Sequence, residues 1–304
     1  MYIGRLRKEG RYSTAHVYEN ALLSFRGFCG TPTVSFGQVT REHLRCYGQY
    51  LYERGLKLNT VSTYMRMLRS IYNRGVESGR APYVHRLCHG VDVRQKKALP
   101  ATELHKLLYG DPKSDILRRT QAIAALMFQF CGMSFADLAH LEKSSLDRNV
   151  LHYNRIKTKT PMSVEILDTA KDMIDQLWNR QPAYPDCPDY LFSILNGDKK
   201  RKDESAYREY QSALRNFNNH LRGLAKALHL TSPVTSYTIR HSWATTAKYR
   251  GVPIEMISES LGHKSIKTTQ IYLKGFALKE RTEVNRMNLS YVKNCLVKRV
   301  NDTK

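Results

Sequence analysis

The sequence lacks the cysteine and histidine spacing of a zinc site. Its six cysteines are widely scattered, and none forms a C-x-x-C pair or stands beside closely spaced histidines. In a chain of 304 residues this pattern indicates reduced thiols, mostly buried, rather than a disulfide framework. A Walker A loop, a dinucleotide-binding glycine motif and an H-E-x-x-H pair are absent as well. We therefore expect no metal and no cofactor, and chemistry carried out by ordinary side chains.

Long apolar runs and acidic residues are also scarce. No run approaches the roughly 18 apolar residues of a membrane span, and the start MYIGRLRKEG has no apolar signal core. Lys and Arg number 49 against 27 Asp and Glu, which gives a formal net charge of +22. Such an excess of one sign favours a polyanionic partner, with nucleic acid ahead of a membrane surface. We expect a soluble, cytoplasmic, nucleoid-associated protein that binds double-stranded DNA and no membrane.

The amino-terminal third of the chain is the most basic part. Residues 1–100 hold 17 Lys and Arg residues but only 6 Asp and Glu. Apolar spacing and capping residues predict three helices in this part, over 13–30, 40–55 and 59–74. The third carries three arginines on one side, Arg66, Arg69 and Arg74. They form either a solvated face or, since nearly all the charges share one sign, a DNA-gripping face.

The rest of the chain predicts a second, mainly α-helical domain. Periodicity lapses near Pro100, so we expect a helical DNA-binding domain at 1–92, a linker at 93–100 and a second domain at 101–304. The alternating stretch 150–167, with a Thr-Lys-Thr-Pro turn inside it, predicts a small antiparallel hairpin. Helices are expected near 101–108, 115–130, 135–142, 169–178, 206–228, 238–249, 254–261, 265–273 and 289–300.

The most informative stretch is 234–273. It contains Tyr237-x-x-Arg240-His241, then Leu261-Gly262-His263, then Thr268-Thr269-x-x-Tyr272. In order, spacing and flanks this stretch resembles the tyrosine recombinase (phage integrase) family, in which a nucleophilic tyrosine follows an L-G-H motif by about nine residues. The segments 58–72 and 130–141 resemble the family's last core-binding helix and its first-arginine helix, so the resemblance is nearly end to end.

The resemblance implies a fold and a reaction. It implies a SAM-like helical core-binding domain and a mostly α catalytic domain with a small antiparallel sheet. It implies site-specific DNA recombination, with Tyr272 as nucleophile, Arg240 as phosphate clamp and His263 as a phosphate or proton partner. A lysine on the hairpin would protonate the leaving oxygen, and either Lys157 or Lys159 stands there. We prefer Lys157.

These residue types suit phosphodiester chemistry without any resemblance. A tyrosine oxygen can attack phosphorus, and the resulting phosphotyrosine ester conserves the bond energy for rejoining. An arginine stays charged and presents a planar fork to two phosphate oxygens. A lysine can act as a general acid where nearby cations lower its pKa.

Two positions depart from the family pattern. Tyr237 stands where the family has histidine; its phenol can donate a hydrogen bond but is no base at neutral pH. More seriously, the first arginine is missing, because its usual places are Ser134 and Cys131. We expect Arg155 to replace it, since strand spacing would put Arg155 and Lys157 on one face. Arg148 is a weaker candidate.

Asp137 stands three residues after the vacant arginine position, where the family has an acid. It would hold cationic partners in place, or else be a plain helix-surface acid. Beyond Tyr272, the residues Leu289, Val292, Leu296 and Val300 recur at helical spacing. The resemblance implies that this tail docks into a neighbouring protomer and closes a homotetramer on DNA with inverted-repeat core sites. Packing of the tail on its own domain is the alternative.

Other functions stay open. A catalytically impaired DNA-binding relative would explain the missing arginine, and a type IB topoisomerase would use similar chemistry without site preference. No arm-binding domain is expected, which favours a DNA invertase or a simple integrase of a mobile element. The target sequence, the accessory factors and the choice between inversion and integration or excision are not encoded in these motifs.

Overall fold

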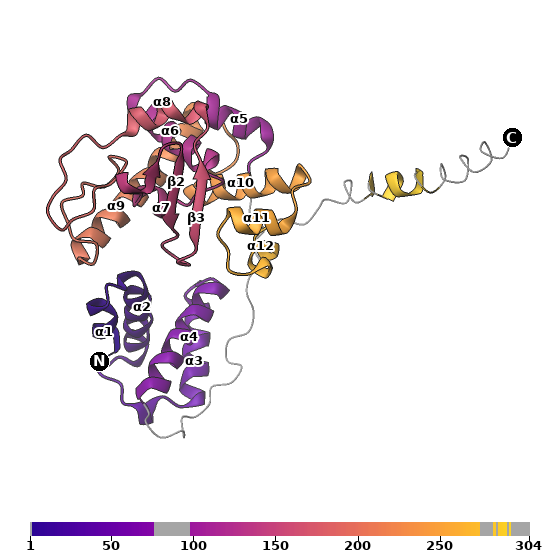
Figure 1. The fold of residues 1–304 in the computed structure, drawn as a ribbon. Helices are drawn as coiled ribbons and strands as arrows, with labels where there is room; N and C mark the ends of the chain where they lie inside the picture. Colours follow the sequence, from indigo (N-terminus) through magenta and orange to yellow (C-terminus); the bar gives the residue numbers. More distant parts are fainter. Residues whose placement is uncertain (1, 76–97, 274–281, 284, 291, 293–304) are drawn as a thin grey trace. The chain divides into compact units, whose positions relative to one another are not determined.

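The computed structural model describes residues 2–75, 98–273, 282–283, 285–290 and 292; the side chains of Ile271 and Tyr272 are not included. This part of the chain is mainly helical and has one small antiparallel sheet, which confirms the predicted fold class (Figure 1). It divides into two compact units, Met1–Arg94 with Ala139–Ser144 and Trp178–Asn216, and the remainder. The predicted linker begins outside the described residues, and the predicted domain boundaries stay predictions.

The amino-terminal helices follow the capping signals of the sequence. They are α1 (Tyr2–Lys8), α2 (Tyr12–Cys29), α3 (Arg41–Glu53) and α4 (Leu58–Gly75), with a short 3₁₀ turn at Phe36–Gln38. Gly30 ends α2 in the left-handed region, at φ 66°, and the hydroxyl of Thr40 accepts the backbone N–H of His43 at the start of α3. The three predicted helices are confirmed. The short α1 was not predicted, because seven residues show little periodicity.

These helices bury two apolar clusters, a small one of Leu6, Ala15 and Tyr18 and a larger one, and both leave the arginines of α4 outside. The larger cluster consists of Phe25, Leu44, Tyr47, Leu51, Val61, Met65 and Leu68. Full burial of each such side chain stabilises the fold by about 1.5–3 kcal/mol. On the other side of α4, Arg66, Arg69 and Arg74 are exposed and line a shallow groove of about 410 Å³ with Ser70 and Asn73.

Eight further helices lie in the described stretch 98–273. They are α5 (Ala101–Tyr109), α6 (Asp115–Gln129), α7 (Phe135–Ala139), α8 (Asp168–Leu177), α9 (Glu204–Ala227), α10 (Ser236–Tyr249), α11 (Ile254–Ser260) and α12 (Ile266–Tyr272). Helix α6 is almost wholly buried over its second half and packs against α5, α8 and α10. The helix predicted at 135–142 ends early, because Glu142 pairs with Tyr190 in an isolated bridge and a 3₁₀ turn follows at Lys143–Ser145.

The sheet confirms the predicted hairpin and adds a strand. Its order is β1 (Leu146–Asp147), β2 (Val150–Asn154) and β3 (Pro161–Glu165), all antiparallel. Leu151 and Val164 are paired and both buried, whereas their neighbours His152 and Ser163 are paired and exposed. Strand β1 was not predicted, since two residues show no alternation. In Figure 1, β3 lies on the side of the sheet nearer to α10, α11 and α12.

The expectation that strand spacing puts Arg155 and Lys157 on one face is wrong. Strand β2 ends at Asn154, and residues 155–160 form the turn, closed by hydrogen bonds from Arg155 N to Thr160 O and from Lys159 N to Arg155 O. Strand alternation therefore does not apply there, and Arg155 is buried while Lys157 is exposed. Most of the tail predicted to be helical at 289–300 lies outside the described residues. Leu289 and Val292 are described, and both are helical and exposed.

Candidate active site

Arg240 is held inside the second unit by the early turns of α10. The helix begins where the hydroxyl of Thr235 accepts the backbone N–H of Thr238. Arg240 follows two residues later and is only 5% exposed. Its Nη1 donates to the carbonyl of Gly132 at 2.7 Å, and its Nη2 donates to the carbonyl of Leu261 at 2.5 Å. Helix α10 therefore fixes this guanidinium group at a set position.

Arg155 lies beside it. This residue follows β2, is 6% exposed, and donates from Nη1 to the carbonyls of Leu261 at 2.6 Å and Gly262 at 3.3 Å. Arg155 and Arg240 thus donate to the same carbonyl oxygen, that of Leu261, so their guanidinium groups are neighbours. Two buried like charges are costly unless hydrogen bonds and an opposite charge compensate them. Such a pair of buried like charges therefore points to a functional site.

Asp137 supplies the opposite charge. It lies on α7, is 3% exposed, and accepts a hydrogen bond from Nε of Arg155 at 3.2 Å. It also accepts the hydroxyl of Ser134 at 2.7 Å and the backbone N–H of Ile156 at 2.9 Å. One carboxylate thus ties α7 to the turn after β2. The two arginines and Asp137 together leave one net positive charge in the interior.

The L-G-H segment lies against these arginines. Gly262 has φ +60°, and a Cβ there would be 2.4 Å from Cδ of Arg155 and 2.7 Å from Sδ of Met162. Glycine is therefore required for the backbone conformation and for the space that Arg155 occupies. His263 follows, and its Nδ1 is 2.9 Å from the hydroxyl of the fully buried Thr269 on α12. This contact links His263 to the helix that ends at Tyr272.

The turn after β2 carries both candidate lysines. Lys157 and Lys159 are exposed, whereas Thr158 and Thr160 between and beside them are half-buried. The hydroxyls of Thr158 and Thr160 lie 3.2 Å and 3.5 Å from the carbonyl oxygen of Gly262. The structure therefore brings the lysine-bearing turn to the L-G-H segment.

The remaining predicted residues lie as follows. Tyr237 is in the first turn of α10, 57% exposed, with its ring 5.6 Å from that of His241. Tyr272 is the last residue of α12, but its side chain lies outside the described part of the structure. Arg148 is exposed in the turn between β1 and β2, whereas Arg155 is buried.

For three residues that lie at the site, the sequence predicted no contact there. Tyr153 on β2 is half-buried, and this burial, with Asp137 nearby, raises the pKa of its phenol. Burial likewise raises the pKa of Cys131, whose backbone has φ 53°. Thr269 was part of the quoted motif without a contact assigned. None has a sequence signal beyond its proximity to motif residues.

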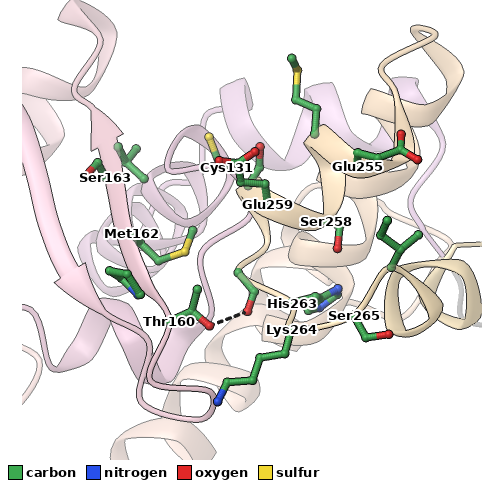
Figure 2. A pocket seen from close by; sticks show the side chains of 16 residues that line it. Cys131, Thr160, Met162, Ser163, Glu255, Ser258, Glu259, His263, Lys264 and Ser265 are labelled. Atoms are coloured by element: carbon green, nitrogen blue, oxygen red, sulfur yellow. Dashed lines mark hydrogen bonds between the residues drawn. The ribbon is translucent and has the colours of Figure 1, made fainter.

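A groove of about 740 Å³ opens next to the site. It is bounded by β3, α11 and the L-G-H segment, and Figure 2 shows Cys131, Met162, Glu259 and His263 around it. Among the residues that the structure describes, no three His, Cys, Asp or Glu side chains are grouped as metal ligands. Nor is any described helix long and apolar enough to span a membrane.

Comparison with known proteins identifies the family. The model of the phage integrase family matches residues 97–277, and that of the phage integrase SAM-like domain matches residues 1–85. The chain therefore belongs to the phage integrase family, and it is a tyrosine recombinase. The resemblance inferred from the motifs and the SAM-like amino-terminal domain are both confirmed.

Individual relatives agree with the family over most of the chain. The tyrosine recombinase XerD of Listeria innocua serovar 6a (strain ATCC BAA-680 / CLIP 11262) is 24% identical over 279 residues, covering 86% of this chain and 87% of that protein. The XerH site-specific recombinase, solved on its palindromic difH substrate after cleavage, matches with a TM-score of 0.64 and 18% identity over 89% of this chain and 79% of that one. A lambda integrase dimer on a COC′ core site gives 0.59 and 15%, over 88% and 92%. At these identities the structural matches show the shared fold.

Proposed function

We propose that this chain is a site-specific DNA recombinase that cuts and rejoins DNA through a 3′-phosphotyrosyl link at Tyr272. The observation that carries the proposal is the pair of buried guanidinium groups of Arg155 and Arg240, which meet at the carbonyl of Leu261 beside the L-G-H segment. A phosphate oxygen carries more negative charge than a carbonyl, so it would bind this pair more strongly.

The cleavage step uses groups of this chain alone. The Tyr272 oxygen attacks phosphorus, its proton passes to His263, and the bond from phosphorus to the 5′ oxygen breaks. Lys157, or Lys159 in its place, gives a proton to that departing oxygen. Arg240 and Arg155 stabilise the charge of the phosphorane, and Tyr237 donates a further hydrogen bond. Attack by another 5′ hydroxyl then reverses the step, which needs no nucleotide hydrolysis because the ester keeps the bond energy.

Arg155 takes the part of the missing first arginine in this proposal. Its contact with Asp137 gives it the charged partner that a buried guanidinium needs, and Ser134 contributes only a hydroxyl to that carboxylate. The hydrogen bonds of Arg155 use Nε and Nη1, and its Nη2 makes none to the described residues. That leaves a donor for a phosphate oxygen. This arrangement weighs against a catalytically impaired relative.

DNA in inverted-repeat core sites is the proposed partner, with four copies of the chain assembled on it. The tail of one copy would occupy the groove beside β3 and α11 in the next copy. The groove presents apolar Met162, Met256 and Ile266 and the carboxylates of Glu255 and Glu259, with Lys264 and His263 at one end. The tail sequence YVKNCLVKRV is apolar and basic, so it complements that groove in both respects.

Charge exchange tests the tail contact. We expect the double change Glu255→Lys and Glu259→Lys to weaken assembly on DNA by about tenfold, because it places cations opposite cations. Adding Lys293→Glu and Lys298→Glu should restore assembly, as measured by mass photometry on a core-site duplex. Failure of the second pair to restore it would argue for packing of the tail on its own domain.

Covalent trapping in the native host tests the reaction itself. Cells expressing the wild type, Tyr272→Phe or Tyr249→Phe are lysed in denaturant, and DNA linked to protein is sequenced. We expect adducts at a repeated site from the wild type and from Tyr249→Phe, a control for loss of an exposed phenol, and none from Tyr272→Phe. Adducts from no form would instead favour the silent DNA binder, and adducts without sequence preference would favour a topoisomerase.

A further inference from the structure

The turn that carries the two lysines is fastened to the L-G-H segment by threonine hydroxyls. The Thr158 hydroxyl donates to the carbonyl of Gly262 at 3.2 Å. The Thr160 hydroxyl donates to Thr158 Oγ1 at 3.0 Å. It also lies 3.5 Å from the carbonyl of Gly262, the contact marked by the dashed line at Thr160 in Figure 2. Thr158 therefore makes the shorter contact with Gly262, and Thr160 supports it.

The peptide that accepts this bond is the one that leads into His263. Its carbonyl belongs to Gly262, and its N–H, on His263, donates to the carbonyl of Ser258 at 3.0 Å. The peptide is thus held on both sides, by Thr158 from the turn and by Ser258 from α11. A displacement of the turn would therefore displace the backbone of His263, and a displacement of His263 would displace the turn.

Thr158 also lies between the two lysines. Lys157 and Lys159 are exposed, so their long side chains are not fixed by packing. A general acid works only when its proton is held within hydrogen-bond reach of the departing oxygen. Because the lysine side chain is flexible, the protein can control the position of its proton only by fixing the backbone of the lysine. The hydrogen bond of Thr158 ties the middle of the turn to Gly262, in addition to the backbone hydrogen bonds that close the turn.

We propose that Thr158 is a positioning residue for the general acid of strand cleavage, acting through the lysine next to it. This inference rests on the proposed function. In the step concerned, the bond between phosphorus and the 5′ oxygen breaks, its electron pair goes to that oxygen, and the lysine Nζ supplies the proton. Thr158 itself touches no reacting atom.

The test replaces the leaving group. A duplex carrying the cleavage site mapped by the trapped adducts is made with an ordinary 5′ oxygen, and again with 5′ sulfur at the scissile phosphate. A thiol has a pKa of about 8.5, so its thiolate leaves without a proton. We expect the Thr158→Val variant to cleave the oxygen substrate about tenfold more slowly than the wild type does. On the sulfur substrate, its cleavage rate should equal that of the wild type. Thr158→Ser keeps the hydroxyl and should stay within about twofold of the wild type on both.

A double-mutant cycle identifies the lysine. If Thr158 acts through Lys157, Thr158→Val adds no further loss on the oxygen substrate once Lys157→Ala is present, yet still does so with Lys159→Ala. The opposite pattern assigns the acid to Lys159, which also fits the proposal. Thr158→Ala, a second variant without the hydroxyl, must show the same dependence on the leaving group, and DNA affinity must be unchanged.

Equal loss on oxygen and sulfur substrates would overturn the proposal, because a merely structural role affects both. Wild-type cleavage of the oxygen substrate by Thr158→Val would overturn it too. Either result would leave the proposed recombinase function intact. If the wild type cleaves neither substrate, the proposed function itself fails, and this inference with it.

Discussion

Two groups of arginines in this chain have opposite surroundings. Arg155 and Arg240 are almost fully buried and donate to backbone carbonyls and to Asp137. Arg66, Arg69 and Arg74 lie exposed along α4, opposite its apolar face. The buried pair is held at fixed positions, as transition-state stabilisation requires. The exposed group lies at the surface, where Arg66 donates to the carbonyl of Ser62 and Arg74 lies over the ring of Tyr2. Its exposure suits contacts to a DNA backbone that vary little with sequence.

Removal of Arg155 is the strongest test of the buried group. We expect Arg155→Ala to slow formation of the covalent adduct about 100- to 1000-fold, since one preorganised donor is lost next to Arg240. Arg148→Ala, which removes the exposed arginine of the neighbouring turn, should leave the rate within about twofold. Single-turnover cleavage of a nicked core-site duplex measures both. Unchanged cleavage by Arg155→Ala would show that Arg155 does not replace the missing arginine.

Gly262→Ala should displace the same guanidinium group without touching its charge. The new Cβ would come within 2.4 Å of Cδ of Arg155, so Arg155 must move. We expect cleavage to fall at least about tenfold. Gly251→Ala is the matched control, because Gly251 also has positive φ, +78°, but nothing lies within 4 Å of its Cβ. Equal losses in the two variants would mean that backbone strain, about 1 kcal/mol or more, explains the effect rather than Arg155.

The exposed group should respond through affinity rather than rate. Each of Arg66→Gln, Arg69→Gln and Arg74→Gln that removes a phosphate contact should reduce the salt dependence of DNA binding by about one unit of slope. Cleavage at saturating protein should stay near the wild-type rate. Arg45→Gln is the control, since Arg45 is exposed on α3 but already paired with Glu42. Fluorescence anisotropy at several salt concentrations measures the slopes. Unchanged slopes would mean that the arginines of α4 face solvent and do not contact DNA phosphates.

The smallest expected effect concerns stability outside both groups. Hydrogen bonds from Ser232 and Thr231 lower the pKa of Glu103 to about 2. A carboxylate with a lowered folded-state pKa stabilises the protein above its ordinary pKa, and this stabilisation is lost as the pH falls from about 4.5 towards 2. Glu103→Gln should therefore cost about 1 kcal/mol near neutral pH and progressively less in acid. Urea unfolding across pH tests this, and a difference that grew in acid would contradict it.

Local signals predicted most of the helices well. Thr40, Gly30 and the apolar spacing of α3 and α4 act within one or two turns, so the sequence shows them directly. Strand pairing at 150–167 follows from alternation in the same way. The prediction about Arg155 and Lys157 failed at the turn after β2, because strand periodicity was extended to Lys157, three residues beyond the end of the strand at Asn154. Arg155 does lie beside Arg240, for a reason that the strand spacing did not contain, and its catalytic role stays a prediction.

The sequence by itself determined the mainly α fold with its small sheet and the family to which the chain belongs, since caps, periodicity and motif spacing are all local. Tertiary structure alone decided that Arg155 and Arg240 meet at one carbonyl, and that Thr158 binds Gly262. Residues 155 and 261 are separated by 106 positions, and residues 158 and 262 by 104. Contacts over such distances depend on how helices and strands pack, and no periodicity along the chain encodes them.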